Sequence, residues 1–161
     1  MKSKDKILIL DFGSQYTQLI ARRIREIGVF SEVKPSSIST EKIIEINPSG
    51  IILSGGPETV TKSSSQKVNK SLLKAKIPIL GICYGMQTIA NELGGSVVKS
   101  DVREFGHAEI SNEKNSILFD NVSFDSNSLS VWMSHGDKVE LLPDNFDIIA
   151  SSKDCRVAGF Q

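Results

Sequence analysis

Three observations predict an α/β fold with a mostly parallel sheet, helices on both faces and additional, partly antiparallel strands in the C-terminal part. First, short apolar runs alternate along residues 7–93 with segments whose apolar residues recur at helical spacing. Second, the apolar runs at residues 50–53 and 77–82 lack polar alternation, as expected of central strands buried on both sides. Third, helical spacing fades after residue 95, and short strand-like runs joined by polar turns follow.

The expected elements follow in chain order. Strands are expected at residues 7–10, 29–33, 50–53 and 77–82, with helices at residues 16–27, 41–46, 68–75 and 86–93. Further strands are expected at residues 96–98, 104–110, 129–133, 147–150 and 156–160. Active sites in parallel sheets of this kind lie at the carboxyl ends of the strands, so the segments after residues 53 and 82 are the first places to examine.

Composition limits the classes of function. The 161 residues, 39% apolar and 24% charged, are enough for one globular domain, expected to span residues 1–161. Lys plus Arg equal Asp plus Glu at 19 each, so no net field favours nucleic acid or an anionic membrane. The polar start followed by a short apolar run fits neither a signal peptide nor a membrane span, and the two cysteines have no metal-ligand spacing. We therefore expect a cytoplasmic protein without a metal.

Cys83 stands between two glycines, after a predicted buried strand and before a predicted helix. The segment reads ILGICYG at residues 79–85, which is the cysteine form of a nucleophile elbow. A sharp strand-to-helix turn brings backbone close to backbone, so Gly81 and Gly85 remove side chains that would clash. The same turn exposes the sulfur at a helix N-terminus, where the helix dipole favours a thiolate. A buried core cysteine is the alternative, and the glycine frame argues against it.

A second loop, SGGP at residues 54–57, follows another predicted strand. Its glycine amides can face a developing negative charge because no side chain blocks them. Together with the amide of Tyr84, this loop could form an oxyanion hole. Gly-Gly-Pro alone is more often an ordinary turn, so the argument depends on its position beside the strand that ends near Cys83.

Four motifs in order carry a family resemblance. They read DFGSQYTQ at residues 11–18, ILSGGPE at 52–58, GICYGMQ at 81–87 and VWMSHGDK at 131–138. They resemble the class I glutamine amidotransferase domains found in GMP synthetases. The resemblance implies a flavodoxin-like fold and hydrolysis of glutamine to glutamate and ammonia, with a thioester on Cys83. It also implies that ammonia passes to an ATP pyrophosphatase domain, fused or separate, which uses ATP and Mg²⁺ to aminate XMP to GMP.

The resemblance also implies roles for individual residues. The backbone amides of Gly56 and Tyr84 match the oxyanion donors, and Gln87 matches a residue that contacts the glutamine substrate. Four residues separate Cys83 from Gln87, so one helical turn could aim the side-chain amide at the same pocket. Three residues match a loop that holds the α-amino and α-carboxylate groups of glutamine: Ser134, Gly136 and Asp137.

The general base of the family is not among these residues. The family pattern places His135 in the substrate loop and supplies the base and its orienter from a separate His-x-Glu segment. His107 occupies a position where relatives often carry a tyrosine. We therefore expect that the 161 residues stop before the His-x-Glu segment, and that residues 1–161 alone have negligible glutaminase turnover, roughly four or more orders of magnitude below an intact domain.

Three alternatives remain open. A non-catalytic glutamine-binding or regulatory module of a synthetase would explain the missing base, although it would not need the complete frame around Cys83. Another cysteine hydrolase of similar fold is the second, and a substrate panel would test it. An ATP pyrophosphatase is the third, because residues 54–56 resemble the start of its phosphate loop, but Pro57 and Glu58 do not continue that motif. No residues suggest a cofactor in this domain.

Overall fold

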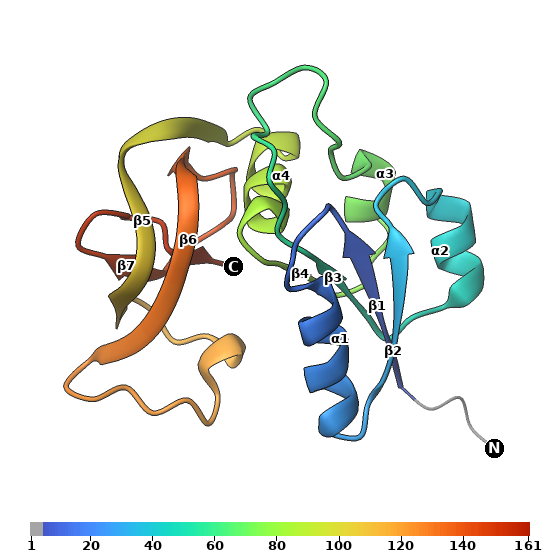
Figure 1. Ribbon diagram of the computed structural model, residues 1–161, viewed down its shortest axis with the longest axis horizontal. Helices are drawn as coiled ribbons and strands as arrows, with labels where there is room; N and C mark the ends of the chain where they lie inside the picture. Colours follow the sequence, from blue (N-terminus) through green and yellow to red (C-terminus); the bar gives the residue numbers. More distant parts are fainter. Residues whose placement is uncertain (1–4) are drawn as a thin grey trace. The chain divides into compact units, whose positions relative to one another are not determined.

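The computed structural model describes residues 5–161, without the side chains of residues 101–105 and His135. The chain divides into two compact units, Met1–Glu92 and Leu93–Gln161 (Figure 1). None of the helices in this described part is long and apolar enough to cross a membrane.

The first unit is a parallel sheet of four strands in the order β2-β1-β3-β4. Its strands are β1 (Lys6–Asp11), β2 (Phe30–Pro35), β3 (Gly50–Leu53) and β4 (Ile79–Gly81). Its helices are α1 (Thr17–Glu26), α2 (Thr40–Ile46), α3 (Lys70–Leu73) and α4 (Tyr84–Glu92) (Figure 1). The chain returns across β1 to add β3 on its other side, which is the flavodoxin-like order. The predicted parallel α/β fold is confirmed.

Both faces of this sheet are covered. Leu8, Ile9 and Leu10 are consecutive on β1, and none is more than 2% exposed. Successive strand side chains point to opposite faces, so three buried in a row require packing on both sides. Helix α1 contacts β1 and β2, and helix α4 contacts β3 and β4. Each fully buried Leu or Ile contributes about 1.5–3 kcal/mol through the hydrophobic effect, which stabilises the central strand.

Local signals explain the helix ends. Ser39 precedes α2, and its side chain accepts a hydrogen bond from the backbone N–H of Lys42. Asn47 ends the same helix in a left-handed conformation with φ 51°, a common way to terminate a helix. Helix α3 is four residues long, shorter than the predicted 68–75, because its first turn begins only after the Asn69 side chain accepts from the N–H of Ser71.

Strands β1 and β3 are joined by a side chain beyond their backbone ladder. The N–H of Ser54 donates to the carbonyl of Leu10 at 3.0 Å, and the N–H of Phe12 then donates to Ser54 Oγ at 2.9 Å. The Ser54 hydroxyl itself donates to the carbonyl of Gly55 at 2.8 Å, and the residue is completely buried. The hydroxyl therefore satisfies two backbone groups at the point where the two strands diverge.

The second unit is an antiparallel sheet in the order β6-β5-β7-β8. Its elements are β5 (Ser96–Asn112), the 3-10 helix η1 (Ile117–Phe119), β6 (Ser128–Leu141), β7 (Ile148–Ser152) and β8 (Gly159–Phe160). The prediction of additional antiparallel strands is confirmed. Two details differ from it: residues 96–98 and 104–110 belong to one strand, and residues 134–137 continue β6 instead of forming a loop. Backbone pairing with β5 accounts for both differences.

The β5–β6 ladder is irregular in one place. Lys99 pairs with Asp137 and Glu104 pairs with His135, so residues 100–103 of β5 stand opposite Gly136 alone. Extra residues on one strand of an antiparallel pair form a bulge, and bulges are common next to functional sites. The irregularity therefore lies opposite the segment that the sequence singled out as a substrate loop.

Candidate active site

Cys83 lies between β4 and α4 in a conformation that L-residues rarely adopt. Its φ is 52°, in the left-handed region, and the residue is half-buried. This conformation costs a non-glycine residue about 1–2 kcal/mol, so it persists only where the surrounding structure requires it. A strained turn of this kind between a strand and a helix is the geometry of a nucleophile elbow.

Two glycines make the turn sterically possible. A methyl group on Gly85 would lie 2.3 Å from the carbonyl oxygen of Leu53, and one on Gly81 would lie 2.6 Å from the carbonyl carbon of Gly85. The N–H of Ile82 donates to the same Leu53 carbonyl at 2.9 Å. The close backbone approach that the sequence predicted is therefore confirmed, and β3 is the surface against which the elbow packs.

The glycine loop after β3 lies beside Cys83. A methyl group on Gly55 would lie 3.6 Å from Cys83 Cβ and 3.6 Å from Ser14 Oγ. A methyl group on Gly56 would lie 2.6 Å from the carbonyl oxygen of Phe12, so this position also requires glycine. Sequence reasoning did not single out Ser14. Its position just after the first strand, where strand ends gather, is the signal that could have identified it.

The backbone and the side chain of Tyr84 face different parts of the first unit. As the first residue of α4, its N–H is one of the amides that a helix leaves without an intrahelical acceptor. Its ring is only 2% exposed and lies 5.4 Å from the ring of Phe12, centroid to centroid. Its hydroxyl donates to the carbonyl of Gln66 at 2.5 Å. Burial raises the pKa of Tyr84, the nearby Ser65 hydroxyl lowers it, and the carboxylates of Glu58 and Glu92 raise it further.

Gln87 is buried. It is 5% exposed, and its N–H donates to the Cys83 carbonyl at 3.0 Å, which places it one helical turn after the cysteine. A solvated helix glutamine is thereby excluded. Within the first unit, the structure thus brings together the predicted residues Cys83, Gly56 and Tyr84 with Gln87 one turn along α4.

The remaining predicted residues belong to the second unit. Ser134, Gly136 and Asp137 lie together on β6, Ser134 exposed and the other two half-buried. His107 is exposed on β5, with Nε2 3.3 Å from Ser130 Oγ. Cys155 is 3% exposed and its thiol donates to the carbonyl of Val157 at 3.4 Å. The packed environment of Cys155 agrees with a structural cysteine.

No group of three or more His, Cys, Asp and Glu among the described residues has the geometry to hold a metal ion. Neither cysteine is in a disulfide. The chemical groups that the first unit does bring together are a thiol, backbone amides at a helix N-terminus and a glycine loop. This set suits attack on a carbonyl carbon and stabilisation of the oxyanion that forms there.

Comparison with known proteins identifies the family. The profile of the class-I glutamine amidotransferase family matches residues 8–161, so the chain belongs to that family. Two curated relatives are the GMP synthases [glutamine-hydrolyzing] of Teredinibacter turnerae, 54% identical over 159 residues, and Histophilus somni, 54% identical over 157 residues. The alignments cover 96% and 95% of this chain, which spans 30% of the length of each relative.

Solved structures support the same family assignment. A Thermoplasma acidophilum protein described as a GMP synthase component superposes with a TM-score of 0.83 at 31% identity, covering 100% of this chain and 79% of its own. A glutamine amidotransferase from Thermotoga maritima superposes with a TM-score of 0.72 at 21% identity, covering 98% of this chain and 71% of its own. The second match concerns the fold alone, which is the flavodoxin-like α/β fold of this family.

Proposed function

We propose that this chain is the glutaminase part of a GMP synthase and that Cys83 is its nucleophile. One observation carries the proposal: Cys83 is held at φ 52° between β4 and α4, where Gly85 packs directly against β3 and Gly81 packs against Gly85. A cysteine with no chemical role would gain nothing from that strain, because the same turn would be more stable with glycine. Both compact units are proposed to be parts of one amidotransferase domain across residues 1–161.

The proposed reaction begins with attack of the Cys83 thiolate on the side-chain carboxamide carbon of glutamine. The carbonyl π electrons move to oxygen and form a tetrahedral oxyanion. Its collapse breaks the carbon–nitrogen bond, the nitrogen takes a proton and leaves as ammonia, and a glutamyl thioester remains on Cys83. Water then adds to the thioester, the thiolate leaves, and glutamate is released.

The amides of Gly56 and Tyr84 are the proposed oxyanion donors. Gly56 continues the Gly55 loop, which lies against Cys83 Cβ, and Tyr84 follows Cys83 directly. Removing one donor of an oxyanion hole typically lowers kcat about 10²–10³-fold, so these amides would supply a large share of the rate. A side-chain substitution cannot remove a backbone N–H. A test of these donors must therefore change the position of the loop that carries Gly56.

Four residues are proposed to bind the glutamine substrate. Gln87 would contact the glutamine substrate, while Ser134, Gly136 and Asp137 would hold its α-amino and α-carboxylate groups. A carboxylate such as Asp137 suits an α-ammonium, and backbone amides near Gly136 suit an α-carboxylate. The base that takes the Cys83 proton is not assigned to any of these residues.

The ammonia is proposed to pass to an ATP pyrophosphatase domain, fused or separate, in a cytoplasmic enzyme of purine biosynthesis. That domain would bind ATP and Mg²⁺ and aminate XMP to GMP. The support is that GMP synthases match nearly the whole chain and extend well beyond it, with 30% of their length covered. No cofactor is proposed for the amidotransferase domain itself.

The test is covalent labelling of the full-length protein with 6-diazo-5-oxonorleucine, a glutamine-like electrophile, followed by peptide mass spectrometry. We expect one adduct, on Cys83, with parallel loss of glutamate release from glutamine. Cys83→Ser should remove the adduct and lower turnover by about four or more orders of magnitude. Cys155→Ser is the matched control, because its hydroxyl can donate to the same Val157 carbonyl and turnover should persist.

Two results would reject the proposal in favour of a rival. Calorimetric binding of glutamine without adduct or turnover would indicate a binding or regulatory module. Turnover of other amides or γ-glutamyl compounds in preference to glutamine would indicate a different cysteine hydrolase. An adduct on Cys155 instead of Cys83 would contradict the assignment of the nucleophile.

A further inference from the structure

Three polar side chains of α4 contact the segment that leads out of the glycine loop. Tyr84, Thr88 and Glu92 are spaced four residues apart, so they lie along one face of the helix. We call these three residues the α4 contact row. The segment opposite them, residues 57–69, is the part of the connection from β3 to α3 that begins immediately after Gly56. Whatever fixes this segment also limits where Gly56 can move.

Each member of the α4 contact row has its own partner. The Tyr84 hydroxyl donates to the Gln66 carbonyl at 2.5 Å. Thr88 Oγ1 accepts from the N–H of Val68 at 3.1 Å, with Thr88 completely buried. These two contacts satisfy buried or partly buried backbone groups of an irregular segment, whose carbonyls and amides have no regular ladder to pair with.

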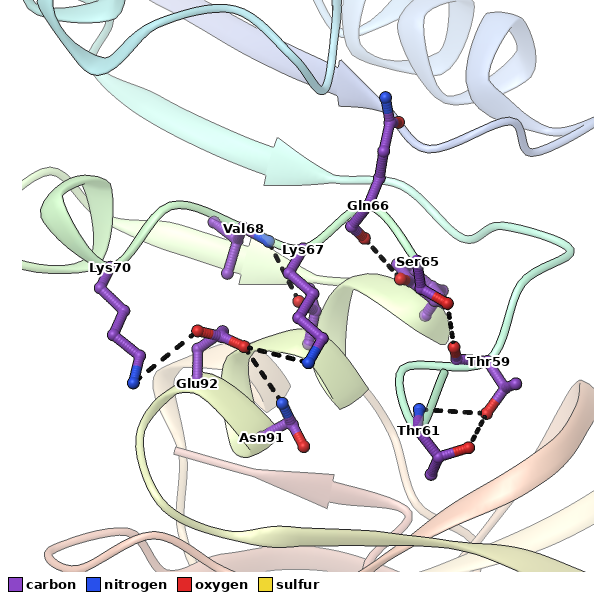
Figure 2. Close-up of polar contacts among 11 residues, drawn as sticks. Thr59, Thr61, Ser65, Gln66, Lys67, Val68, Lys70, Asn91 and Glu92 are labelled. Atoms are coloured by element: carbon purple, nitrogen blue, oxygen red, sulfur yellow. Dashed lines mark hydrogen bonds and ion pairs between the residues drawn. The ribbon is translucent and has the colours of Figure 1, made fainter. Parts of the chain in front are cut away.

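The third member is ionic. The Glu92 carboxylate lies 3.8 Å from Lys67 Nζ and 3.9 Å from Lys70 Nζ, and its side chain is 14% exposed. Figure 2 shows both lysines reaching toward Glu92, which also accepts a hydrogen bond from the Asn91 amide at 3.1 Å. The lysines are 34% and 65% exposed, so this part of the row is the weaker one.

The segment is ordered within itself as well. Ser65 Oγ donates to the carbonyl of Thr59 at 2.5 Å, and the N–H of Thr61 donates to Thr59 Oγ1 at 3.3 Å (Figure 2). A constraint applied at Gln66 is thus passed to Thr59, three residues from Gly56. Without these internal bonds, a contact at residue 66 would have little effect on the glycine loop.

The ring of Tyr84 makes a second contact near the proposed oxyanion hole. Its ring packs on Phe12, and the Phe12 carbonyl oxygen lies where a methyl on Gly56 would be 2.6 Å away. Tyr84 therefore contacts Phe12, which lies against Gly56, and Gln66, which lies in the segment that follows the glycine loop. The backbone N–H of Tyr84 is the other proposed oxyanion donor, so Tyr84 links the two proposed donors.

We infer that the Tyr84 hydroxyl is a positioning group that sets the Gly56 loop relative to Cys83, by bonding the Gln66 carbonyl; the inference rests on the proposed glutaminase function. A carbonyl can only accept, so Tyr84 must be the donor in this bond. A tyrosine hydroxyl is protonated at neutral pH, so it can donate to this carbonyl. The remaining ring of a phenylalanine would keep the Phe12 contact but lose the bond to Gln66.

The test is Tyr84→Phe in the full-length protein. We expect kcat for glutamine hydrolysis to fall about tenfold, with KM within about twofold, because the lost bond affects a geometry needed in the transition state more than in substrate binding. Hydrogen exchange of segment 57–69 should rise. Alkylation of Cys83 by iodoacetamide should keep its rate, since that reaction forms no oxyanion. Tyr16→Phe is the matched control, as Tyr16 is 56% exposed, and it should change none of these.

A second pair of variants guards against a general folding defect. Thr88→Val removes the bond to Val68 without changing side-chain size, and it should lower kcat several-fold with the same rise in exchange. Ser63→Ala, which removes an exposed hydroxyl of the same segment, is its control. Melting temperatures of all four variants show whether folding is intact.

The outcomes separate the inference from the function on which it rests. Wild-type kcat in Tyr84→Phe despite faster exchange in segment 57–69 would overturn the inference and leave the glutaminase proposal standing. An equal loss of turnover and of iodoacetamide reactivity would also overturn it, because the effect would then be on the thiol. Absence of glutamine hydrolysis in the wild type would reject the proposed function itself, while unchanged exchange in both variants would show that the contacts do not restrain the segment.

Discussion

Two motif glycines, Gly85 in the first unit and Gly136 in the second, have opposite surroundings. A methyl group on Gly85 would lie 2.3 Å from the Leu53 carbonyl oxygen, whereas one on Gly136 would have no atom within 4 Å. Packing alone therefore demands glycine at the elbow. On β6 packing does not demand glycine, and on our proposal the role of Gly136 is to bind the substrate. The same residue type is thus structural in one unit and, on our proposal, functional in the other.

Gly85→Ala is the substitution with the largest expected effect. Neither backbone can move without separating α4 from β3, so we expect a loss of about 3 kcal/mol or more in the free energy of unfolding, or no folded protein. Denaturant unfolding monitored by circular dichroism measures this. A variant as stable as the wild type would mean that the elbow does not pack on β3 as described.

Gly136→Ala is its counterpart in the second unit. Its stability should stay within about 0.5 kcal/mol of the wild type, because space is available. If the backbone at Gly136 contacts the substrate, kcat/KM for glutamine should nonetheless fall. Unchanged stability with unchanged kcat/KM would remove Gly136 from the proposed binding residues.

A comparison of Cys83→Gly with Cys83→Ala measures the backbone strain at position 83. Both variants should lose glutaminase activity, but Cys83→Gly should be more stable than Cys83→Ala by about 1 kcal/mol, because glycine adopts φ 52° without a steric penalty. Paired melting curves make the comparison. Equal stability would show that the left-handed conformation stores no strain at this position.

Alkaline pH sharpens the role assigned to Tyr84. Burial raises its pKa in the folded state, so the unfolded chain loses the tyrosine proton first as the pH rises. The associated stability is complete below about pH 10, the ordinary tyrosine pKa, and is lost as pH rises through the folded-state value. The wild type should therefore lose stability above that pH more steeply than Tyr84→Phe. Parallel slopes in urea unfolding at several pH values would contradict the burial of this hydroxyl.

Glu92→Gln should have the smallest effect. Its two lysine partners are partly exposed, so the loss should be about 0.5 kcal/mol or less, and added salt should reduce the difference from the wild type. Thermal melts at low and high salt measure it. A loss of stability larger than that of Tyr84→Phe would make the ionic part of the α4 contact row the stronger restraint.

The sequence predicted the first unit well because its signals are local. Strand β3 matches the expected residues 50–53, and the elbow was readable from Cys83 and its flanking glycines. The side-chain role of Tyr84 was not readable, because its partner Gln66 is eighteen residues away and offers only a backbone carbonyl. Every residue has a backbone carbonyl, so the sequence does not indicate which one will accept a hydrogen bond.

The second unit was harder for a related reason. The strand at 128–141 was predicted to end near residue 133, because the polar residues that follow look like a loop. Pairing with β5 extends it, and the irregularity opposite Gly136 depends on which residues of two distant segments face each other. Register between strands is a tertiary property, so no single segment encodes it.

The buried hydroxyl of Ser54 has a consequence for anyone who wishes to transplant the Cys83 turn into another scaffold. It joins β1 to β3 at the point where the backbone ladder stops, so the glycine loop starts from a rigid point. A grafted Gly-x-Cys-x-Gly segment without an equivalent hydroxyl would leave the Phe12 N–H position without an acceptor inside the new host, at a cost of about 1–3 kcal/mol. The portable unit is therefore a pair of neighbouring strand ends, joined by a serine, and not the cysteine turn alone.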